Sequence, residues 1–94
     1  MKECTDQELI KKLQGGENPA LNELMARYKH RVFAFIRRYV GDEDVAYDLV
    51  QETFTKLYFS ASTYKSEYKF STWLFQIALN LCRDHGRKKK LVHF

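Results

Sequence analysis

Residues 64–90 read YKSEYKFSTWLFQIALNLCRDHGRKKK and predict a helix with two different faces. From Ser71 onward, one set of side chains recurs at steps of three and four residues, as on the buried side of an amphipathic helix. This set comprises Leu74, Ile77, Ala78, Leu81 and His85. A second line carries an aromatic ring, two amides and two guanidinium groups, at Trp73, Gln76, Asn80, Arg83 and Arg87. Those groups can stack on a base, bond a base edge and neutralise phosphate, but the pattern alone fits an ordinary solvated face equally well.

The composition indicates one small helical domain. The chain has 94 residues, of which 45% are hydrophobic and 15% aromatic, so it can bury a modest core. One proline and four glycines favour helices. No apolar run approaches the ~20 residues of a membrane span, and Lys2, Glu3 and Asp6 leave no room for a signal-peptide core. We therefore expect a cytoplasmic protein without membrane insertion.

The net charge of +4 is unevenly distributed along the chain. Residues 1–60 hold nine Lys or Arg against ten Asp or Glu, a balance of −1, while residues 61–94 hold seven against two, a balance of +5. This asymmetry suggests an anionic partner for the C-terminal third. The basic run at residues 87–90 is weak evidence by itself, because such runs are often only solubilising tails or the start of a linker.

Capping signals predict two helices at the front of the chain. Thr5 caps the first helix, Glu8 completes a capping box, and Gly15-Gly16 stops it. Asn18-Pro19 opens a long second helix, which ends at Gly41. The apolar stripe of the second helix is expected to comprise Leu21, Leu24, Met25, Tyr28, Val32, Phe35, Ile36 and Tyr39.

A third helix is predicted after the acidic run at residues 42–44, which suits the positive end of a helix macrodipole. Its inner side is expected to comprise Val45, Leu49, Thr53, Phe54, Leu57 and Tyr58. Its outer side is expected to comprise Asp48, Gln51, Glu52 and Thr55. This outer line is either a solvated face or a docking surface for a basic partner, and apolar Val50 beside it slightly favours docking.

Residues 60–69 have no helical period, so we interpret them as a loop. The fourth helix is expected to begin with Ser71 or Thr72 as its cap. It is expected to end at Arg83 or a little beyond, because Gly86 weakens it. No strand-like alternation occurs in the sequence. The chain is therefore predicted to be all-α, a compact bundle of three to four helices.

Catalytic and metal chemistry finds little support in the sequence. The three histidines are scattered, and His85 on the apolar stripe is expected to be a partly buried structural residue. Asp48 and Glu52 lie one helical turn apart, but no histidine accompanies them at di-iron spacing. Cys4 and Cys82 have no Cys or His at ligand spacing, and Cys82 is expected to be a packed core side chain. We therefore expect no enzyme, no metal site and no cofactor.

The segment at residues 63–70 mixes aromatic rings with lysines. Single-stranded nucleic acids bind such surfaces, because bases stack on rings, at ~1–3 kcal/mol per base, while lysines meet phosphates. The candidate residues are Tyr64, Lys65, Ser66 and Tyr68. The alternative is that the rings only pack the loop against the core. We expect Phe70 to do this, and the sequence leaves Tyr64 and Tyr68 open.

Two motifs follow each other along the chain, DLVQETF at residues 48–54 and FSTWLFQIALNLCRDH at residues 70–85. Together they resemble region 2 of the extracytoplasmic-function (group IV) sigma factors of bacterial RNA polymerase. The earlier helix with Tyr28, Val32, Phe35 and Arg38, and the GDED turn after it, fit the same pattern. The resemblance covers nearly the whole chain, and the combination is more specific than either motif alone.

The resemblance implies a transcription initiation factor domain that docks on RNA polymerase and recognises and melts the promoter −10 element. The outer line of the third helix would dock on the clamp helices of the β′ subunit. Residues 63–67 would capture a base flipped from the −10 element. The non-template strand and the adjacent duplex would be bound by the face of the fourth helix that carries Trp73, Gln76, Asn80 and Arg83. A protein that binds the unpaired strand better than the duplex favours opening. An anti-sigma factor would be a further partner, covering the same surfaces.

Two departures from the family pattern bear on this expectation. Lys65-Ser66 stands where many relatives have Arg-Gly, and Gln76 where a basic residue is common, so we expect a different base preference and a stiffer loop. The family normally continues into a helix-turn-helix domain that reads the −35 element, so we expect this chain to be a fragment. Residues 1–94 would be one sigma region 2 domain, with residues 87–94 as a basic tail or the start of the interdomain linker.

Two other functions stay open on the sequence. One is a helical protein–protein interaction module, whose acidic face binds a protein and whose basic tail is inert. The other is a repressor of helix-turn-helix type that binds duplex DNA. Such a repressor requires a short recognition helix after a tight turn, and the long loop predicted at residues 60–69 argues against one.

Overall fold

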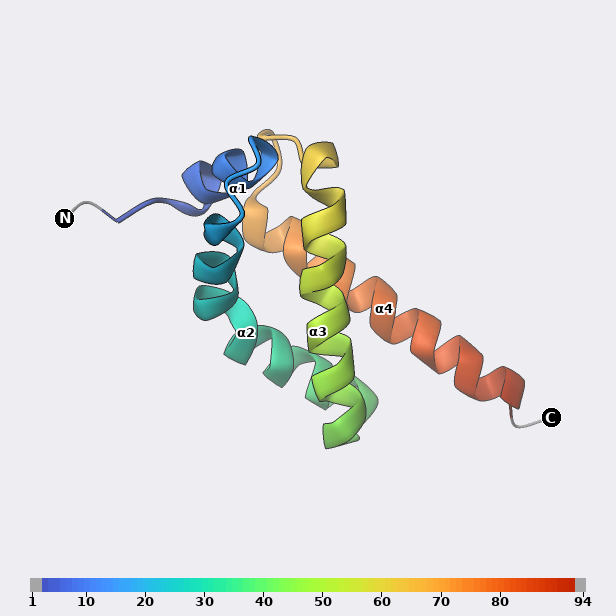
Figure 1. The fold of residues 1–94 in the computed structure, drawn as a ribbon. Helices are drawn as coiled ribbons and strands as arrows, with labels where there is room; N and C mark the ends of the chain where they lie inside the picture. The colour runs from blue at the N-terminus through green and yellow to red at the C-terminus, as the bar shows by residue number, and fades with distance from the viewer. Residues whose placement is uncertain (1–2, 93–94) are drawn as a thin grey trace.

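Residues 3–92 fold into four α helices and one short 3₁₀ helix (Figure 1). The computed structural model describes residues 3–92, with side chains described for residues 3–88. The helices are α1 (Asp6–Gln14), α2 (Pro19–Val40), α3 (Glu43–Ser60), η1 (Ala61–Thr63) and α4 (Phe70–Val92). No strand occurs within the described range. The all-α prediction is therefore confirmed.

The first three α helices begin, and the first two also end, where capping signals stand in the sequence. The Glu8 backbone N–H donates to Thr5 Oγ1 at 3.1 Å, and the Thr5 N–H donates to Glu8 Oε1 at 3.0 Å, so the predicted capping box is present. Pro19 opens α2, where its missing N–H leaves no bond unmade. Gly41 ends α2 with a φ of 75°, in the left-handed region that glycine adopts without strain. Asp42 caps α3 by accepting from a backbone N–H at 3.0 Å.

The segment predicted as a loop, residues 60–69, is partly helical. Ser60 is the last residue of α3, and the next three residues form η1. Ala61 is buried, and its carbonyl accepts from the Tyr64 N–H at 3.2 Å. Residues 64–69 form an irregular connection, in which the Tyr68 N–H donates to the Lys65 carbonyl at 3.0 Å. The absence of a helical period did not reveal η1, because a single 3₁₀ turn is too short to show one.

Helix α4 begins two or three residues earlier than the predicted cap at Ser71 or Thr72 implies. Its first residue is Phe70, so neither Ser71 nor Thr72 is its cap. The Phe70 side chain is 1% exposed and packs edge-on against Tyr28, with 5.7 Å between ring centroids. This buried ring fixes the start of the helix, which a capping rule based on hydroxyl side chains could not anticipate.

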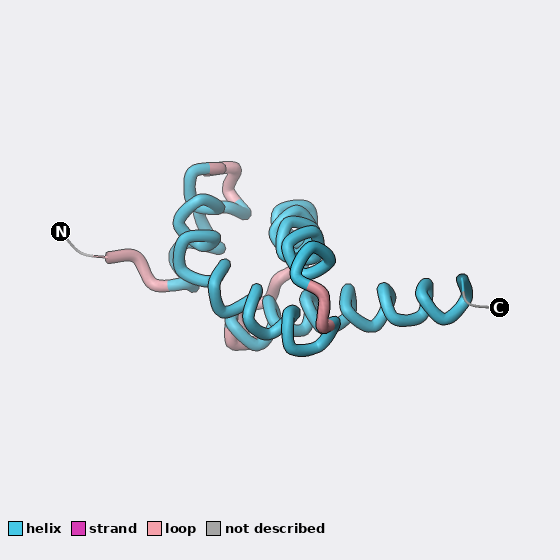
Figure 2. The backbone as a smooth tube through the Cα atoms, turned by 90° about the horizontal axis from the view of Figure 1, so that it is seen from below, coloured by secondary structure: helices cyan, strands magenta, loops and turns pink. Residues whose placement is uncertain are grey.

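Helix α4 also extends farther than predicted, passing Gly86 instead of ending near Arg83. An internal glycine weakens a helix by about 1 kcal/mol, but the Arg and Lys residues after it are good helix formers. Arg87 also donates to the Asp84 carboxylate three residues earlier. The far end of α4 lies beyond the other helices in both views (Figures 1 and 2). The molecule measures 52, 24 and 20 Å along its principal axes. Of the predicted tail, residues 93–94 and the side chains from residue 89 onward lie outside the described part.

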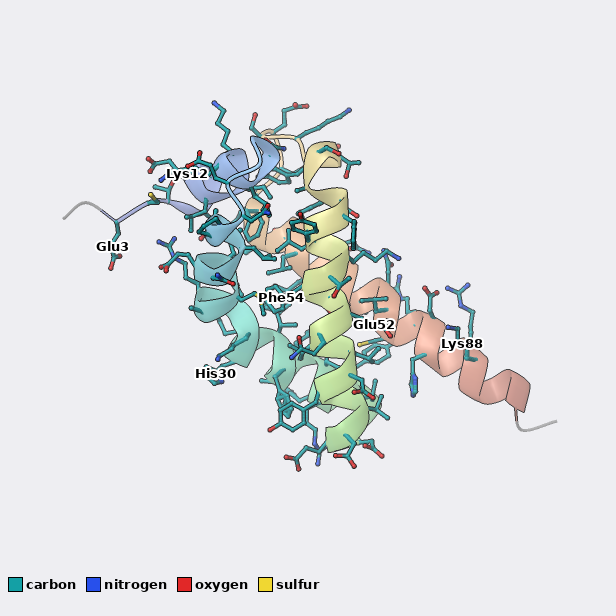
Figure 3. All side chains as sticks on the ribbon, in the orientation of Figure 1. Glu3, Lys12, His30, Glu52, Phe54 and Lys88 are labelled. Carbon is teal, nitrogen blue, oxygen red and sulfur yellow. The ribbon has the colours of Figure 1, made fainter. Side chains whose placement is uncertain are left out.

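Helix α2 packs against each of the other three α helices, and α3 also packs against α4. Phe54, which is 2% exposed, lies between α2 and α3 (Figure 3). The buried Thr53 hydroxyl donates to the Leu49 carbonyl at 2.7 Å, so its burial leaves no polar group unsatisfied. Tyr39 and Tyr58, both predicted on apolar stripes, are 52% and 38% exposed. They lie at the edges of the stripes, where a tyrosine can keep its hydroxyl in water. Buried residues from α2 and α3 are Ala20, Leu24, Tyr28, Val32, Ile36, Ala46, Leu49, Val50, Thr53, Phe54 and Leu57.

Candidate nucleic-acid interface

Four polar side chains of α4 are exposed along one line, as their spacing predicts, and we call them the polar line. They are Gln76, Asn80, Arg83 and Arg87. Gln76 Nε2 donates to Asn80 Oδ1 at 3.2 Å, so the two amides are aligned one turn apart. This bond leaves the Asn80 NH₂ group available to a base edge. Arg83 makes no ion pair with another described residue, whereas Arg87 pairs with Asp84.

Trp73, the one tryptophan of the chain, is only partly presented on this face. Its ring centroid lies 5.0 Å from that of Tyr64 and 6.1 Å from that of Phe70. The neighbouring rings therefore cover part of the indole. Only the remaining part can contact a ligand, which is less than the sequence pattern predicts.

Tyr64 is a core residue and not an open stacking platform. It is 6% exposed, and its ring lies 6.0 Å from that of Phe70 in an edge-on arrangement. Its hydroxyl donates to the Tyr68 carbonyl and accepts from Gln7 Nε2 at 2.6 Å. Of the two roles that the sequence leaves open for Tyr64, the structure shows the packing one, because the ring is buried and the hydroxyl is bonded; a part for Tyr64 in DNA binding stays a prediction.

The rest of the loop remains accessible at the end of the bundle, near α1 and the start of α4 (Figure 1). Tyr68 is 59% exposed. Lys65, Ser66 and Lys69 are exposed as well. The loop therefore presents one open aromatic ring, two ammonium groups and a hydroxyl, which together suit an unpaired, anionic strand.

A second candidate surface, which we call the docking face, lies on α3. It comprises the four residues Asp48, Gln51, Glu52 and Thr55, all of them exposed. Val50, predicted to favour docking from beside them, is instead 8% exposed and belongs to the core. Successive residues of a helix are about 100° apart, so the neighbour of Gln51 can point inward. The docking face is therefore polar and carries two carboxylates.

An apolar groove of about 540 Å³ borders the docking face. Gln51 and Thr55 line it together with apolar side chains of α2 and α3. Phe59 in its lining is 76% exposed. Phe59 was not predicted to be functional, although an aromatic residue that lies off the apolar stripe at the end of a helix can indicate an exposed contact site. A large exposed aromatic beside a groove is typical of a protein contact.

Glu52 of the docking face also borders a hollow between α3 and α4, of about 440 Å³ (Figure 3). Lys56 lines this hollow from α3, and His85, Arg87 and Lys88 line it from α4. His85 is half-buried here, as expected for a structural residue. The docking face and the far end of the polar line therefore share one hollow, a connection that the sequence alone did not reveal.

Shifted pKa values occur at core residues. Burial raises the pKa of Tyr28, and a hydrogen bond from its hydroxyl to Asp6 raises it further. Burial also raises the pKa of the Cys82 thiol, which is a packed core side chain as predicted. Within the described residues, no group of three or more His, Cys, Asp or Glu could bind a metal ion. None of the helices in that range is long and apolar enough to cross a membrane.

Comparisons with known proteins agree with the resemblance carried by the motifs. The family model described as Sigma-70 region 2 matches residues 24–92. The ECF RNA polymerase sigma-E factors of Haemophilus influenzae and Escherichia coli (strain K12) are each 39% identical over 83 residues, which cover 88% of this chain and 43% of each relative. The chain thus spans less than half the length of these relatives.

A solved structure matches almost the whole fold. The NMR structure of a complex between an engineered region 2 of sigmaE and GTAAAA superposes with a TM-score of 0.85. It is 40% identical in sequence, and the match covers 96% of this chain and 95% of that chain. The chain therefore belongs to the Sigma-70 region 2 family, as a region 2 domain of the extracytoplasmic-function type.

Proposed function

We propose that this domain belongs to a transcription initiation factor that docks on RNA polymerase and recognises and melts the promoter −10 element. The observation that carries the proposal is the exposed polar line of α4, which follows a loop bearing the open Tyr68 ring. The same fold, in an engineered sigmaE region 2, was solved in complex with GTAAAA. The balance of +5 over residues 61–94 suits an anionic strand.

The loop would bind a base that has left the stack. Tyr68 would stack on that base, while Lys65 and Ser66 would meet its phosphate and polar edge. Tyr64 would act as a support, because its buried ring holds the base of the loop. Groups of this kind cannot reach a base inside a duplex, so their binding energy favours the open strand and drives melting.

The polar line would bind the rest of the non-template strand and the adjacent duplex. Asn80 would bond a base edge with its NH₂ group, oriented by the bond from Gln76. Arg83 and Arg87 would neutralise phosphates without selecting a base. Trp73 would contribute the uncovered part of its ring. Sequence selectivity would therefore come from the loop and Asn80, and most of the salt dependence from the arginines.

The docking face would bind the clamp helices of the β′ subunit. Its two carboxylates and its amide favour a basic partner and fix the register of the contact. Phe59 and the apolar groove beside this face would add buried area. An anti-sigma factor would cover the same surfaces as the polymerase and DNA. The proposed function involves no catalysis and no cofactor, places the protein in the cytoplasm, and treats residues 1–94 as one domain with residues 87–94 leading into a tail or linker.

Fluorescence-anisotropy titration with single-stranded −10 non-template oligonucleotides tests this function. The pools are randomised at one position at a time and compared with matched duplexes at two salt concentrations. Strand-selective binding that depends on sequence is the expected result. Weak binding that is equal for all sequences and disappears with salt would overturn the proposal, because basic side chains alone produce that behaviour.

A helical protein–protein interaction module is the alternative, and the groove beside Phe59 is the observation that favours it. In that case the polar line would be an ordinary solvated face. Such a module would bind a protein partner through α2 and α3 while showing no strand selectivity in the titration. A helix-turn-helix repressor, the other rival, would prefer duplex to single strand in the same experiment.

A further inference from the structure

Two glutamines of α1 form hydrogen bonds with both ends of the loop. Gln14 Nε2 donates to the carbonyl of Ala61 at 2.9 Å and to that of Tyr64 at 3.0 Å. Gln7 Nε2 donates to the Tyr64 hydroxyl at 2.6 Å and to the Tyr68 carbonyl at 3.4 Å. Gln7 and Gln14 are about two helical turns apart, so they project from the same side of α1.

These bonds fix the segment that lies between them. The carbonyls of Ala61 and Tyr64 stand where the loop begins, and the Tyr68 carbonyl stands near its end. The Tyr64 hydroxyl links the two ends by donating to Tyr68. Residues 65–67 lie between these points and are exposed. The position of residues 65–67 therefore depends on α1.

Polar bonds connect this side of α1 to the loop, while α1 also packs against η1. A hollow of about 480 Å³ opens beside these bonds, with Ile10, Lys11 and Ser66 among its lining residues. The attachment of α1 to α2 does not use these glutamines, because Leu9, Ile10 and Leu13 are buried and Asp6 accepts from Arg27 and Tyr28. Loss of a glutamine amide should therefore release the loop without releasing α1.

We infer that Gln7 and Gln14 are positioning residues for base selection, and that α1 is part of the promoter-reading apparatus without touching the base. The inference rests on the proposed function of the loop. Binding groups select well only when they are held within ~0.5 Å of their productive positions. A loop released at either end still carries Lys65 and Tyr68, so it still binds a strand, but with less discrimination between bases.

Two substitutions and a matched control test the inference. Gln14→Glu keeps the side-chain shape but turns a carboxylate toward two carbonyl oxygens, and Gln7→Met removes the other amide. Lys12→Gln, also on α1, is the control, because it lowers the charge by one unit as Gln14→Glu does. The Lys12 side chain lies on α1 (Figure 3), and its ammonium donates to Cys4 Sγ at 3.4 Å instead of bonding to the loop. Far-UV circular dichroism checks that each variant is folded. If Gln14→Glu does not fold, the Gln7→Met variant by itself tests the inference.

The first measurement is acrylamide quenching of Trp73 without DNA. Trp73 is the one tryptophan, and the Tyr64 ring covers part of it. We expect the quenching constant to rise in Gln14→Glu and Gln7→Met and to stay at the wild-type value in Lys12→Gln. Unchanged quenching in both variants would overturn the inference, because the loop would then hold its position without these bonds.

The second measurement is the base-preference profile over the −10 oligonucleotide pools. At the position read by the loop, we expect discrimination to fall roughly three- to tenfold in both variants, while the position read by Asn80 keeps its preference. Raised Trp73 quenching with an unchanged base-preference profile would overturn the inference and leave the proposed function standing. A wild-type protein with no base preference would overturn the proposed function, and the inference with it, before any variant is compared.

Discussion

Replacing Asn80 by alanine removes the one residue of the polar line that we expect to read a base. Its Oδ1 already accepts from Gln76 Nε2 at 3.2 Å, so its NH₂ group is what remains for DNA. A bidentate pair between an amide and a base discriminates by ~1–3 kcal/mol. Because Asn80 offers one of these two bonds, we expect about half of that effect. The loss of ~0.5–1.5 kcal/mol corresponds to binding that is roughly two- to twelvefold weaker.

The same substitution should leave the fold intact. Asn80 is exposed, and exposed substitutions usually change the free energy of unfolding by less than about 0.5 kcal/mol. Alanine has the higher helix propensity, by up to ~0.7 kcal/mol, whereas loss of the bond from Gln76 removes ~0.2–0.5 kcal/mol. These small opposing effects nearly cancel. Weaker binding by Asn80→Ala could therefore not be attributed to unfolding, and thermal melts would verify this.

Anisotropy titration measures affinity and base preference together when each oligonucleotide pool carries one chosen base at one chosen position of the −10 strand. Asn80→Ala is expected to flatten the preference at one position of the strand and to leave the others unchanged. Asn22→Ala is the matched control, because Asn22 is also an exposed helical asparagine but lies on α2. An equal loss at every position, or no loss at all, would refute a base-reading role for Asn80.

The other predictions concern phosphate binding, docking and a buried tyrosine. Arg83→Ala is expected to weaken binding to all oligonucleotides alike and to lower the salt slope by about 1, measured by titration over several salt concentrations. Asp48→Arg or Glu52→Arg is expected to abolish co-precipitation with RNA polymerase while the circular dichroism spectrum stays the same, and retained co-precipitation would remove the docking assignment. The pKa of Tyr28 is raised above its ordinary value of 10.0, so its contribution to stability is complete below pH 10.0 and is lost as the pH rises through the folded-state pKa. Urea titrations should therefore show the free energy of unfolding falling in this range, and falling less steeply in Tyr28→Phe; equal slopes would contradict the reasoning.

The helices of this domain could be predicted because short local patterns specify them. The capping box of Thr5 and Glu8, the left-handed Gly41 and the cap at Asp42 each involve residues within one turn of each other. Helical periodicity also placed the polar line of α4 on one exposed face. The roles of those residues in DNA binding stay predictions, because exposure shows what a side chain can reach and not what it binds.

The loop could not be predicted in the same way, because distant residues determine its structure. Tyr64 stands in a polar stretch that looks exposed, yet it is bonded to Gln7, which lies 57 residues away in the sequence. A tyrosine can bury its ring and still satisfy its hydroxyl, so composition does not reveal which side it takes. The partial cover on Trp73 and the groove beside Phe59 also depend on contacts between helices.

Phe70 connects the loop and the start of α4 to the core. Its ring is 1% exposed and lies within 5.7–6.1 Å of the rings of Tyr28, Tyr64 and Trp73. The loop and the start of the polar line are therefore held relative to each other in the free protein, which would lower the entropy lost on the proposed binding of DNA. The docking face, by contrast, is a single surface of α3. Under the proposed function, base selection would depend on packing among α1, α2 and α4, whereas the residues of the docking face all lie on α3, so partial loosening of the core should impair base selection first.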